Sequence, residues 1–390
     1  MIDLERVRAE TPGCLDRVFL DSAGSSLPPE RVVQAVVDHL RREAVVGGYV
    51  AEEERTADLA GVREAVARLL RCTPDCIALA DSATRAWAQF FYAVPLAPGD
   101  RILLSRSEYA GNAVAALQRA RLHGARVDVV PADESGELDL EALERMLDER
   151  VRLVSLVHVP TNGGLVNPVR EATELVHRVG GLVLLDACQS IGQLDVDVRS
   201  LDVDALTAPG RKWLRGPRGS GFLYVRPDLI RVLEPPVVDL KSATWTAADR
   251  YELRDDAIRF ELWEADHAAR LGLKVAVEYL LELGLDAVVA AVAERAELLR
   301  TLLAEIPGVT VTDLGRRRCG IVSFVVEGVP AAAVRDALAD RRITVTISSR
   351  SSTLLDMTDR ALDAVVRASP HYFVSEEQLE ATAGAVSELI

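Results

Sequence analysis

Short apolar runs alternate with amphipathic segments through the first two thirds of the chain. Runs with the length and composition of strands lie at 18–21, 77–80, 101–104, 126–130, 153–157, 182–185, 205–207 and 221–225. Helical patterns lie between them, at about 29–45, 54–71, 83–93 and 112–123. Strands separated by helices are typical of βαβ units, so the pattern predicts an α/β fold with a mainly parallel sheet. Continuous apolar runs such as 182–185 fit strands that are buried on both faces.

The first long helix and the last third of the chain show different patterns. The predicted helix at 29–45 has apolar residues on one face and ends at Gly47-Gly48. That face consists of Val32, Val33, Val36, Val37 and Leu40. After Pro235-Pro236 a long helical stretch at about 265–283 precedes expected strands near 309–312, 321–326 and 343–347. We therefore expect an N-terminal segment (1–20), a large α/β domain (21–260), and a connecting helix with a small α+β C-terminal domain (261–390).

Composition narrows the class of protein. The 390 residues carry a formal net charge of −15, which argues against nucleic acid as a partner. The first residues lack the apolar core of a signal peptide, and no run reaches the roughly 18 apolar residues of a membrane span. We expect a cytoplasmic protein that binds no membrane.

Two residue types sharpen the search for a site. The five cysteines are an odd number, and Cys72 and Cys76 lack a second pair at metal-binding spacing, so we expect structural roles for them and no metal site. Lysine is rare: among 45 basic residues only Lys212, Lys241 and Lys274 are lysine. A lysine within a motif of this sequence is therefore a stronger indication of a functional role than it would be in a lysine-rich chain.

The strongest chemical signal is a carboxylate and a lysine at the ends of successive strands. Asp186 ends one apolar run, and Lys212 follows the next. In an open α/β sheet the carboxyl ends of the strands face one ligand-binding crevice. Pyridoxal 5′-phosphate (PLP) requires this pair, because a lysine amine forms an imine with its aldehyde and a carboxylate keeps its ring nitrogen protonated. The alternative makes Asp186 a helix cap and Lys212 a surface residue.

A phosphate-binding segment is expected where a strand passes into a helix. Ser82, Ala83 and Thr84 lie at such a junction, where free backbone N–H groups attract an anion. Thr84 adds a hydroxyl group, and Arg211 can supply a fixed positive charge. Taken alone, the segment also fits a helix that is merely capped by Asp81 or Ser82.

In combination these motifs resemble the class V aminotransferase family, which includes cysteine desulfurases, isopenicillin N epimerase-like proteins and carbon–sulfur lyases. The motifs are Ser-Ala-Thr (82–84), Glu-Tyr-x-x-Asn (108–112), Asn162, Asp-Ala-Cys-Gln (186–189), and Arg-Lys (211–212) with Gly-Pro-Arg-Gly (216–219). The resemblance covers roughly residues 18–375. It implies PLP fold type I, with a mainly parallel seven-stranded sheet in the large domain, and a homodimer with shared active sites.

The resemblance also implies roles for individual residues. Lys212 would be the Schiff-base lysine and Asp186 the partner of the ring nitrogen. Tyr109 would stack on the ring, and Gln189 and Asn162 would bond its 3′-oxygen or the substrate.

Within the family the likeness is greatest to hercynylcysteine sulfoxide lyases. It rests on 46–50, 108–109, 211–213 and 367–371. This likeness implies that Arg367 grips the substrate carboxylate with its planar fork and that Tyr49 contacts the substrate.

The sequence departs from the family pattern in two places. Pro209-Gly210 precedes Arg211, where many relatives have a serine before His-Lys. Some of the residues that bind the phosphate must therefore differ from those of these relatives. The segment 260–267, which usually carries small residues and reaches the partner's site, contains Trp263. The second departure affects which substrate the site accepts more than which type of reaction it catalyses.

The absence of one cysteine guides the choice of reaction. A persulfide-forming desulfurase needs a thiolate in a mobile loop, but the corresponding stretch, 346–360, contains no cysteine, and Cys319 is expected to be buried. We therefore predict a PLP-dependent carbon–sulfur β-lyase on an S-substituted cysteine or its sulfoxide, releasing thiol or sulfenate, pyruvate and ammonia. Lys212 would act as the general base.

Other outcomes of the same chemistry stay open. They are a decarboxylating or oxidative deaminating enzyme on a similar substrate, an amino-acid epimerase, an aminotransferase, and a catalytically silent binding protein. The sequence does not determine which bond at Cα is broken.

Overall fold

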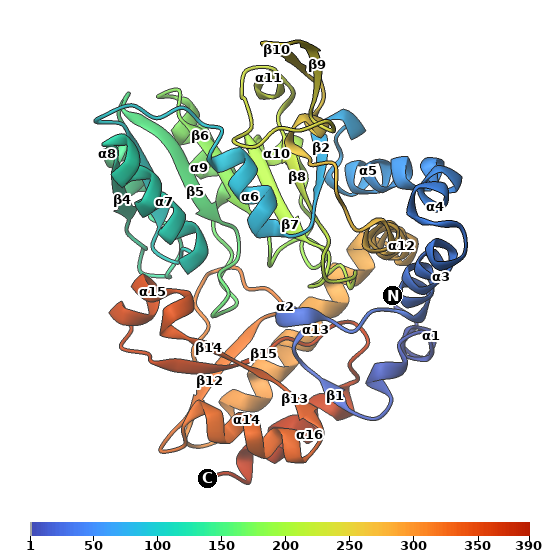
Figure 1. The fold of residues 1–390 in the computed structure, drawn as a ribbon. Helices are drawn as coiled ribbons and strands as arrows, with labels where there is room; N and C mark the ends of the chain where they lie inside the picture. The colour runs from blue at the N-terminus through green and yellow to red at the C-terminus, as the bar shows by residue number, and fades with distance from the viewer. Residues whose placement is uncertain (1) are drawn as a thin grey trace.

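The computed structural model describes residues 2–390 and contains a central seven-stranded sheet (Figure 1). Its strand order is β2-β8-β7-β6-β5-β3-β4. The strands are β2 (Ile77–Ala80), β3 (Arg101–Ser105), β4 (Arg126–Val130), β5 (Val151–Val157), β6 (Leu182–Asp186), β7 (Ala205–Pro209) and β8 (Gly221–Val225). Within this sheet β8 runs opposite to all the other strands, so its pairings with β2 and β7 are antiparallel. The predicted mainly parallel sheet is confirmed.

Helices cover both faces of this sheet because its strands are apolar on both sides. Along β6, Leu184 belongs to one buried cluster, whereas Val183 and Leu185 belong to the other. The first cluster is shared with α6 (Ala83–Phe91) and α7 (Ala110–His123). The second is shared with α5 (Thr56–Leu70), α8 (Leu140–Met146), α9 (Val169–His177) and α12 (His267–Leu283). This is the three-layer arrangement expected from continuous apolar strands.

A smaller α+β region lies beyond one end of this sheet (lower part of Figure 1). Its antiparallel sheet has the order β11-β12-β15-β14. The strands are β11 (Val309–Val311), β12 (Val322–Val326), β14 (Thr346–Ser349) and β15 (Ala364–Ala368). Its helices are α13 (Leu285–Ala304), α14 (Ala331–Asp340), α15 (Leu354–Asp359) and α16 (Glu376–Ser387). The predicted large and small parts are therefore confirmed, and the boundaries at residues 20 and 260 stay predictions.

Three strand features differ from the expectation. The run near 343–347 divides into β13 (Ile343–Thr344) and β14, which belong to different sheets. β13 pairs in parallel with β1 (Val18–Phe19), which ties the N-terminus to the C-terminal region. β15 was not predicted, and neither was the hairpin of β9 (Ala243–Ala247) and β10 (Arg250–Leu253). Arg367 interrupts the apolar run of β15, and the hairpin is mostly exposed, so neither has a clear hydrophobic pattern.

The predicted helix near 29–45 is α3 (Glu30–Val46), but much of its apolar face is not buried. Val32 is buried, whereas Leu40 is 51% exposed and Val33 is 39% exposed. Gly47 ends the helix with a φ of 85°, as the sequence indicates. Part of the apolar face that the sequence predicts is therefore open to solvent in this chain.

The remaining elements are short. They are α1 (Leu4–Ala9), α2 (Ser22–Ser25), α4 (Gly48–Glu54), α10 (Val198–Leu201), α11 (Pro227–Ile230), and 3₁₀ turns at Pro12–Cys14, Pro74–Cys76, Ala257–Phe260 and Arg350–Ser352. Between residues 2 and 390, no helix combines the length and the apolar character needed to span a membrane.

Candidate active site

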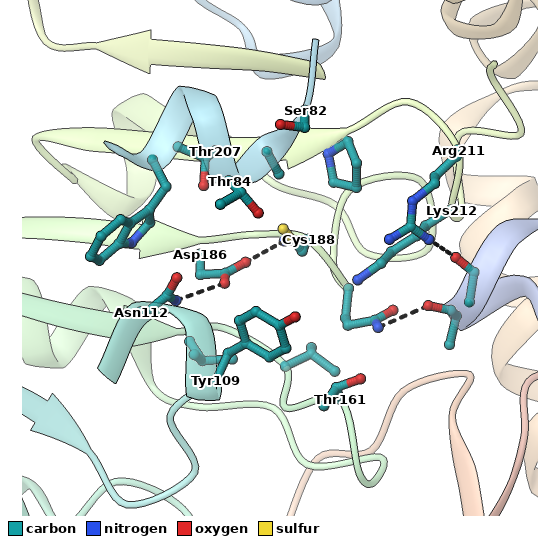
Figure 2. Close-up of a pocket in the computed structure, with 18 of the residues that line it drawn as sticks. Ser82, Thr84, Tyr109, Asn112, Thr161, Asp186, Cys188, Thr207, Arg211 and Lys212 are labelled. Carbon is teal, nitrogen blue, oxygen red and sulfur yellow. Dashed lines mark hydrogen bonds between the residues drawn. The ribbon is translucent and has the colours of Figure 1, made fainter. Parts of the chain in front are cut away.

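A cavity of about 400 Å³ lies at the carboxyl ends of the central strands (Figure 2). Its walls come from the ends of β5, β6 and β7, the first turn of α6, the short helix α2, and the C-terminal region. Of the residues predicted from sequence, it brings together Ser82, Ala83, Thr84, Tyr109, Asp186, Gln189, Arg211, Lys212 and Arg367. Residues far apart in the chain therefore meet in one crevice, at the edge where parallel strands place their ligands.

Lys212 points into this cavity toward Asp186 and Cys188 (Figure 2). It lies three residues after the end of β7, in a turn closed by the bond from Arg215 N to Lys212 O (2.9 Å). Burial lowers the pKa of the Lys212 amine, and the positive charge of Arg211 acts in the same direction. A lowered pKa favours the neutral amine, which is the form that can act as a nucleophile or a base.

Asp186 is fixed in place by two donors. It is only 6% exposed. Its Oδ2 accepts a hydrogen bond from Asn112 Nδ2 (2.9 Å), and its Oδ1 accepts one from the backbone N–H of Cys188 (2.9 Å). No lysine or arginine among residues 2–390 forms an ion pair with it. A buried carboxylate with donors but no cation fits a ligand that brings a protonated ring nitrogen.

The first turn of α6 faces the same cavity. Ser82 is the N-cap, and its Oγ accepts from the Arg85 N–H (3.2 Å). The earlier N–H groups of the turn have no partner within the helix, and Thr84 adds its hydroxyl group to the cavity wall. Arg211 and Arg218 bring positive charge to the wall. These groups fit a phosphate monoester.

Arg367 reaches the cavity from β15. Its Nη1 donates to Thr161 O (3.0 Å) and Thr161 Oγ1 (2.9 Å), and its Nη2 donates to Asp21 Oδ1 (3.1 Å). Its Nε is buried and has no partner among the described residues. The guanidinium group is therefore held rigidly from two sides and keeps donor capacity for a carboxylate.

A family model for "Aminotransferase class-V" matches residues 18–382. The chain belongs to the class V aminotransferase family. The resemblance to this family is thereby confirmed, and so are PLP fold type I and the classification as a PLP-dependent enzyme.

Proteins similar to this class V chain are described as cysteine desulfurases or as a C–S lyase. A probable cysteine desulfurase of Methanothermobacter thermautotrophicus is 29% identical over 99% of this chain and 98% of its own length. The structure of a cysteine desulfurase from Thermococcus onnurineus is 25% identical with a TM-score of 0.92, covering 100% of this chain and 98% of the other.

Two solved structures of the cystine C–S lyase C-DES also match. Its complex with the product cysteine persulfide is 25% identical with a TM-score of 0.87, covering 97% of this chain and 99% of the other. A variant with glycine covalently linked to the PLP cofactor is also 25% identical, with a TM-score of 0.88 and coverage of 98% and 99%. The cofactor of this class V chain is PLP, as predicted.

Two residues with predicted roles, Gln189 and Asn162, bond to other groups of the class V chain. Gln189 lines the cavity, but its Nε2 donates to Ala23 O (3.0 Å) and its Oε1 accepts from Trp213 Nε1 (3.0 Å). Asn162 donates to Asp356 Oδ2 (2.6 Å) and is not among the residues that line the cavity. Their roles, like those of the other site residues, stay predictions.

Tyr49 lies outside the cavity that contains Lys212. It is 79% exposed and lines a second hollow together with Lys241 and Trp263. Within a single chain the structure does not bring it to the predicted site.

Some cavity residues were not assigned a role from sequence. They are Ala23, Gly24, Asp81, Trp87, Asn112, Thr161, Cys188, Thr207, Arg218, Ser220 and Ser352 among others. Asn112 and Arg218 belong to the motifs quoted above, so their spacing from Tyr109 and Lys212 was an available signal. Thr161 and Ser352 had no such signal, since only the folded chain brings their loops to the strand ends.

Proposed function

We propose that this class V enzyme is a carbon–sulfur β-lyase that acts on an S-substituted cysteine or its sulfoxide. The products would be a thiol or sulfenate, pyruvate and ammonia. The observation that carries the proposal is the set of groups in the cavity: a buried lysine, an anchored carboxylate and an arginine, without a reactive thiol. Such a set can break the Cβ–S bond but offers no acceptor for the sulfur atom.

The cysteines support this proposal. Within residues 2–390, Cys188 is the cysteine that lines the cavity, and burial raises the pKa of its thiol well above the ordinary value. Thiolates, not thiols, attack sulfur, so this environment makes Cys188 a poor acceptor. The stretch 346–360 contributes Ser352 to the cavity wall in place of a cysteine. Cys319 is buried away from the cavity.

Each end of the amino-acid substrate has a partner in the chain. Arg367 would bind the carboxylate, and Lys212, whose pKa is lowered, would accept the Cα proton. Asp186 would hold the ring nitrogen, and the first turn of α6 with Thr84 and Arg211 would hold the phosphate. When bound, PLP supplies an electron sink for the negative charge that develops at Cα. Tyr109, at the N-terminus of α7, would cover one face of the ring.

A second candidate is desulfuration of free cysteine, which the names of the relatives favour. The two reactions differ in their carbon product: removal of sulfur from cysteine leaves alanine, whereas β-elimination leaves pyruvate and ammonia. C-DES, described as a C–S lyase with cysteine persulfide as product, supports the lyase candidate.

The test is to incubate the PLP-loaded enzyme with S-alkylcysteines, their sulfoxides, cystine and cysteine. Pyruvate, ammonia, alanine, thiol and carbon dioxide are then measured together. Pyruvate and thiol in equal amounts support the lyase. Alanine formation, or carbon dioxide release without pyruvate, would contradict it and favour the desulfurase or a decarboxylating enzyme.

We also propose that the enzyme is a homodimer in which the two copies complete each other's sites. The supporting feature is a group of exposed large apolar side chains around one hollow, Leu40, Tyr49 and Trp263. Such a concentration of large apolar side chains is typical of a subunit interface. In this arrangement the partner's Tyr49 could approach the substrate, which Tyr49 does not do within one chain.

A further inference from the structure

Behind Asp186 lies a second acidic residue that the proposed mechanism does not use. Glu108 is 3% exposed and precedes α7, and Asn112 lies one turn further along that helix. The single amide nitrogen Asn112 Nδ2 donates to Glu108 Oε1 (2.9 Å) and to Asp186 Oδ2 (2.9 Å). The two carboxyl groups are therefore joined through one buried amide.

Glu108 is buried with hydrogen-bond donors at one of its carboxyl oxygens and without a cation. Its Oε1 accepts from Asn112 and from the Tyr109 N–H (2.9 Å), whereas its Oε2 is buried without a hydrogen-bond partner among the described residues. No cation between residues 2 and 390 forms an ion pair with it. An ionised carboxylate in this position would bury an uncompensated charge beside the charge of Asp186.

The electrostatics of the surroundings agree with this geometry. Burial, together with the negative charge of Asp186, raises the pKa of Glu108 to about 8. The groups that face it are Asn112 and the Tyr109 amide from α7, Ser155 from β5 and Asp186 from β6. Among these only Asp186 is a carboxyl group.

We propose that Glu108 is a positioning residue of the PLP site, which acts as a neutral acid. It orients the Asn112 amide so that this amide anchors Asp186, and it leaves Asp186 as the single negative charge opposite the ring nitrogen. The inference rests on the proposed pairing of Asp186 with that nitrogen. It adds Glu108 and Asn112 to the groups that determine how firmly the ring is held in its protonated form.

The test compares Glu108→Gln with Glu108→Ala and Asn112→Ala in the PLP-loaded enzyme. Glutamine keeps the acceptor oxygen and the shape but has no charge, so Glu108→Gln should release PLP with a dissociation constant within about threefold of wild type. Glu108→Ala loses the bonds from Asn112 and from the Tyr109 N–H, and Asn112→Ala loses the bonds to Glu108 and Asp186, so their dissociation constants should rise about tenfold or more. The pH midpoint of the visible absorption band of the bound cofactor should move in these two variants and stay in place in Glu108→Gln.

Thermal unfolding provides a second readout. The folded protein holds the Glu108 proton up to a pH of about 8, whereas the unfolded chain releases it near the ordinary value of 4.5. Wild type therefore loses stability as the pH rises through this window, and Glu108→Gln does not. The melting temperature of Glu108→Gln relative to wild type should rise by several degrees between pH 5 and 8.

The matched control is Glu137→Gln, which removes a buried carboxylate with an ionic partner. Glu137 is 7% exposed and pairs with Arg316 (2.6 Å), so this variant should lower the melting temperature and leave the spectrum unchanged. If Glu108→Gln releases PLP as readily as Glu108→Ala, the charge is required and the inference is wrong. It is equally wrong if all three site variants keep the wild-type spectrum and affinity. These readouts do not depend on which substrate bond is broken, so a failed lyase assay leaves them intact.

Discussion

At the level of single residues, Lys212 lies in an environment that differs from that of Lys274. Lys212 is enclosed in the cavity, and the pKa of its amine is lowered. Lys274, on α12, instead forms ion pairs with Asp58 and Glu278. The rarity of lysine made Lys212 conspicuous in the sequence, and its burial gives the physical reason for its reactivity.

We predict that Lys212→Ala reduces turnover by about three orders of magnitude or more, because both the attachment point of the cofactor and the general base are lost. Borohydride reduction of the wild-type holoenzyme should fix the cofactor on the peptide that contains Lys212, as mass spectrometry would detect. Lys274→Ala is the matched control and should retain turnover. Full turnover in Lys212→Ala would refute the assignment.

Arg367 should determine substrate affinity rather than chemistry. Lysine cannot make the fork of bonds that joins Thr161, Asp21 and a substrate carboxylate. We expect Arg367→Lys to raise KM by about 10- to 100-fold, corresponding to about 1.4–2.8 kcal/mol, with a smaller change in kcat. Steady-state kinetics would check this, with the exposed Arg170→Lys as control. An unchanged KM would remove Arg367 from the substrate site.

At the level of elements, the approach of β8 to α6 shapes the phosphate end of the cavity. A Cβ atom on Gly221, the first residue of β8, would lie 3.0 Å from the carbonyl carbon of Ser82 and 3.1 Å from the nitrogen of Ala83. Both contacts are with backbone atoms, which cannot move aside as a flexible side chain does. A glycine is required here because strand and helix start are in close contact.

We predict that Gly221→Ala destabilises the fold by about 1–3 kcal/mol and weakens PLP binding, because it pushes the first turn of α6 out of place. Chemical denaturation and the dissociation of PLP from the holoenzyme would measure the two effects. Gly384 lies in α16 with no atom within 4 Å of its Cβ position, so Gly384→Ala should be neutral or stabilising by up to about 1 kcal/mol. Equal behaviour of the two variants would contradict the prediction.

At the level of the whole molecule, the apolar surface around Tyr49 and Trp263 remains unfilled. Leu40 and Trp263 are 51% and 52% exposed, and they lie with Tyr49 around one hollow. The net charge of −15 favours solubility but does not explain a concentration of apolar side chains at one place. The proposed dimer would cover these side chains.

Trp263→Glu should convert the dimer to a monomer and reduce turnover, because a buried charge without a partner disrupts an apolar interface. Light scattering of the purified protein would give the mass, with Leu122→Glu on the outer side of α7 as a control that stays dimeric. Leu122 is 66% exposed and far in sequence from the proposed interface. A wild-type protein that is monomeric at micromolar concentration would refute the proposal.

The sequence by itself determined the order of elements in the large domain and the pair of groups at its centre. Apolar runs such as β6 are easy to recognise in the sequence because a strand that is buried on both faces contains few polar residues. Asp186 and Lys212 were found for the same reason, since Asp186 ends one such run, Lys212 lies shortly after the next, and the carboxyl ends of parallel strands share one edge.

Tertiary structure decided what periodicity cannot encode. The strand that carries Arg367 was missed because this arginine breaks its apolar pattern, and only the fold places it against Asp21 near the N-terminus. The exposure of part of the apolar face of α3 could not be predicted, because periodicity reports an apolar face and not what covers it. The link from Glu108 through Asn112 to Asp186 connects Asp186 to residues at least 74 positions away, and its strength comes from burial, which exists only in the folded chain.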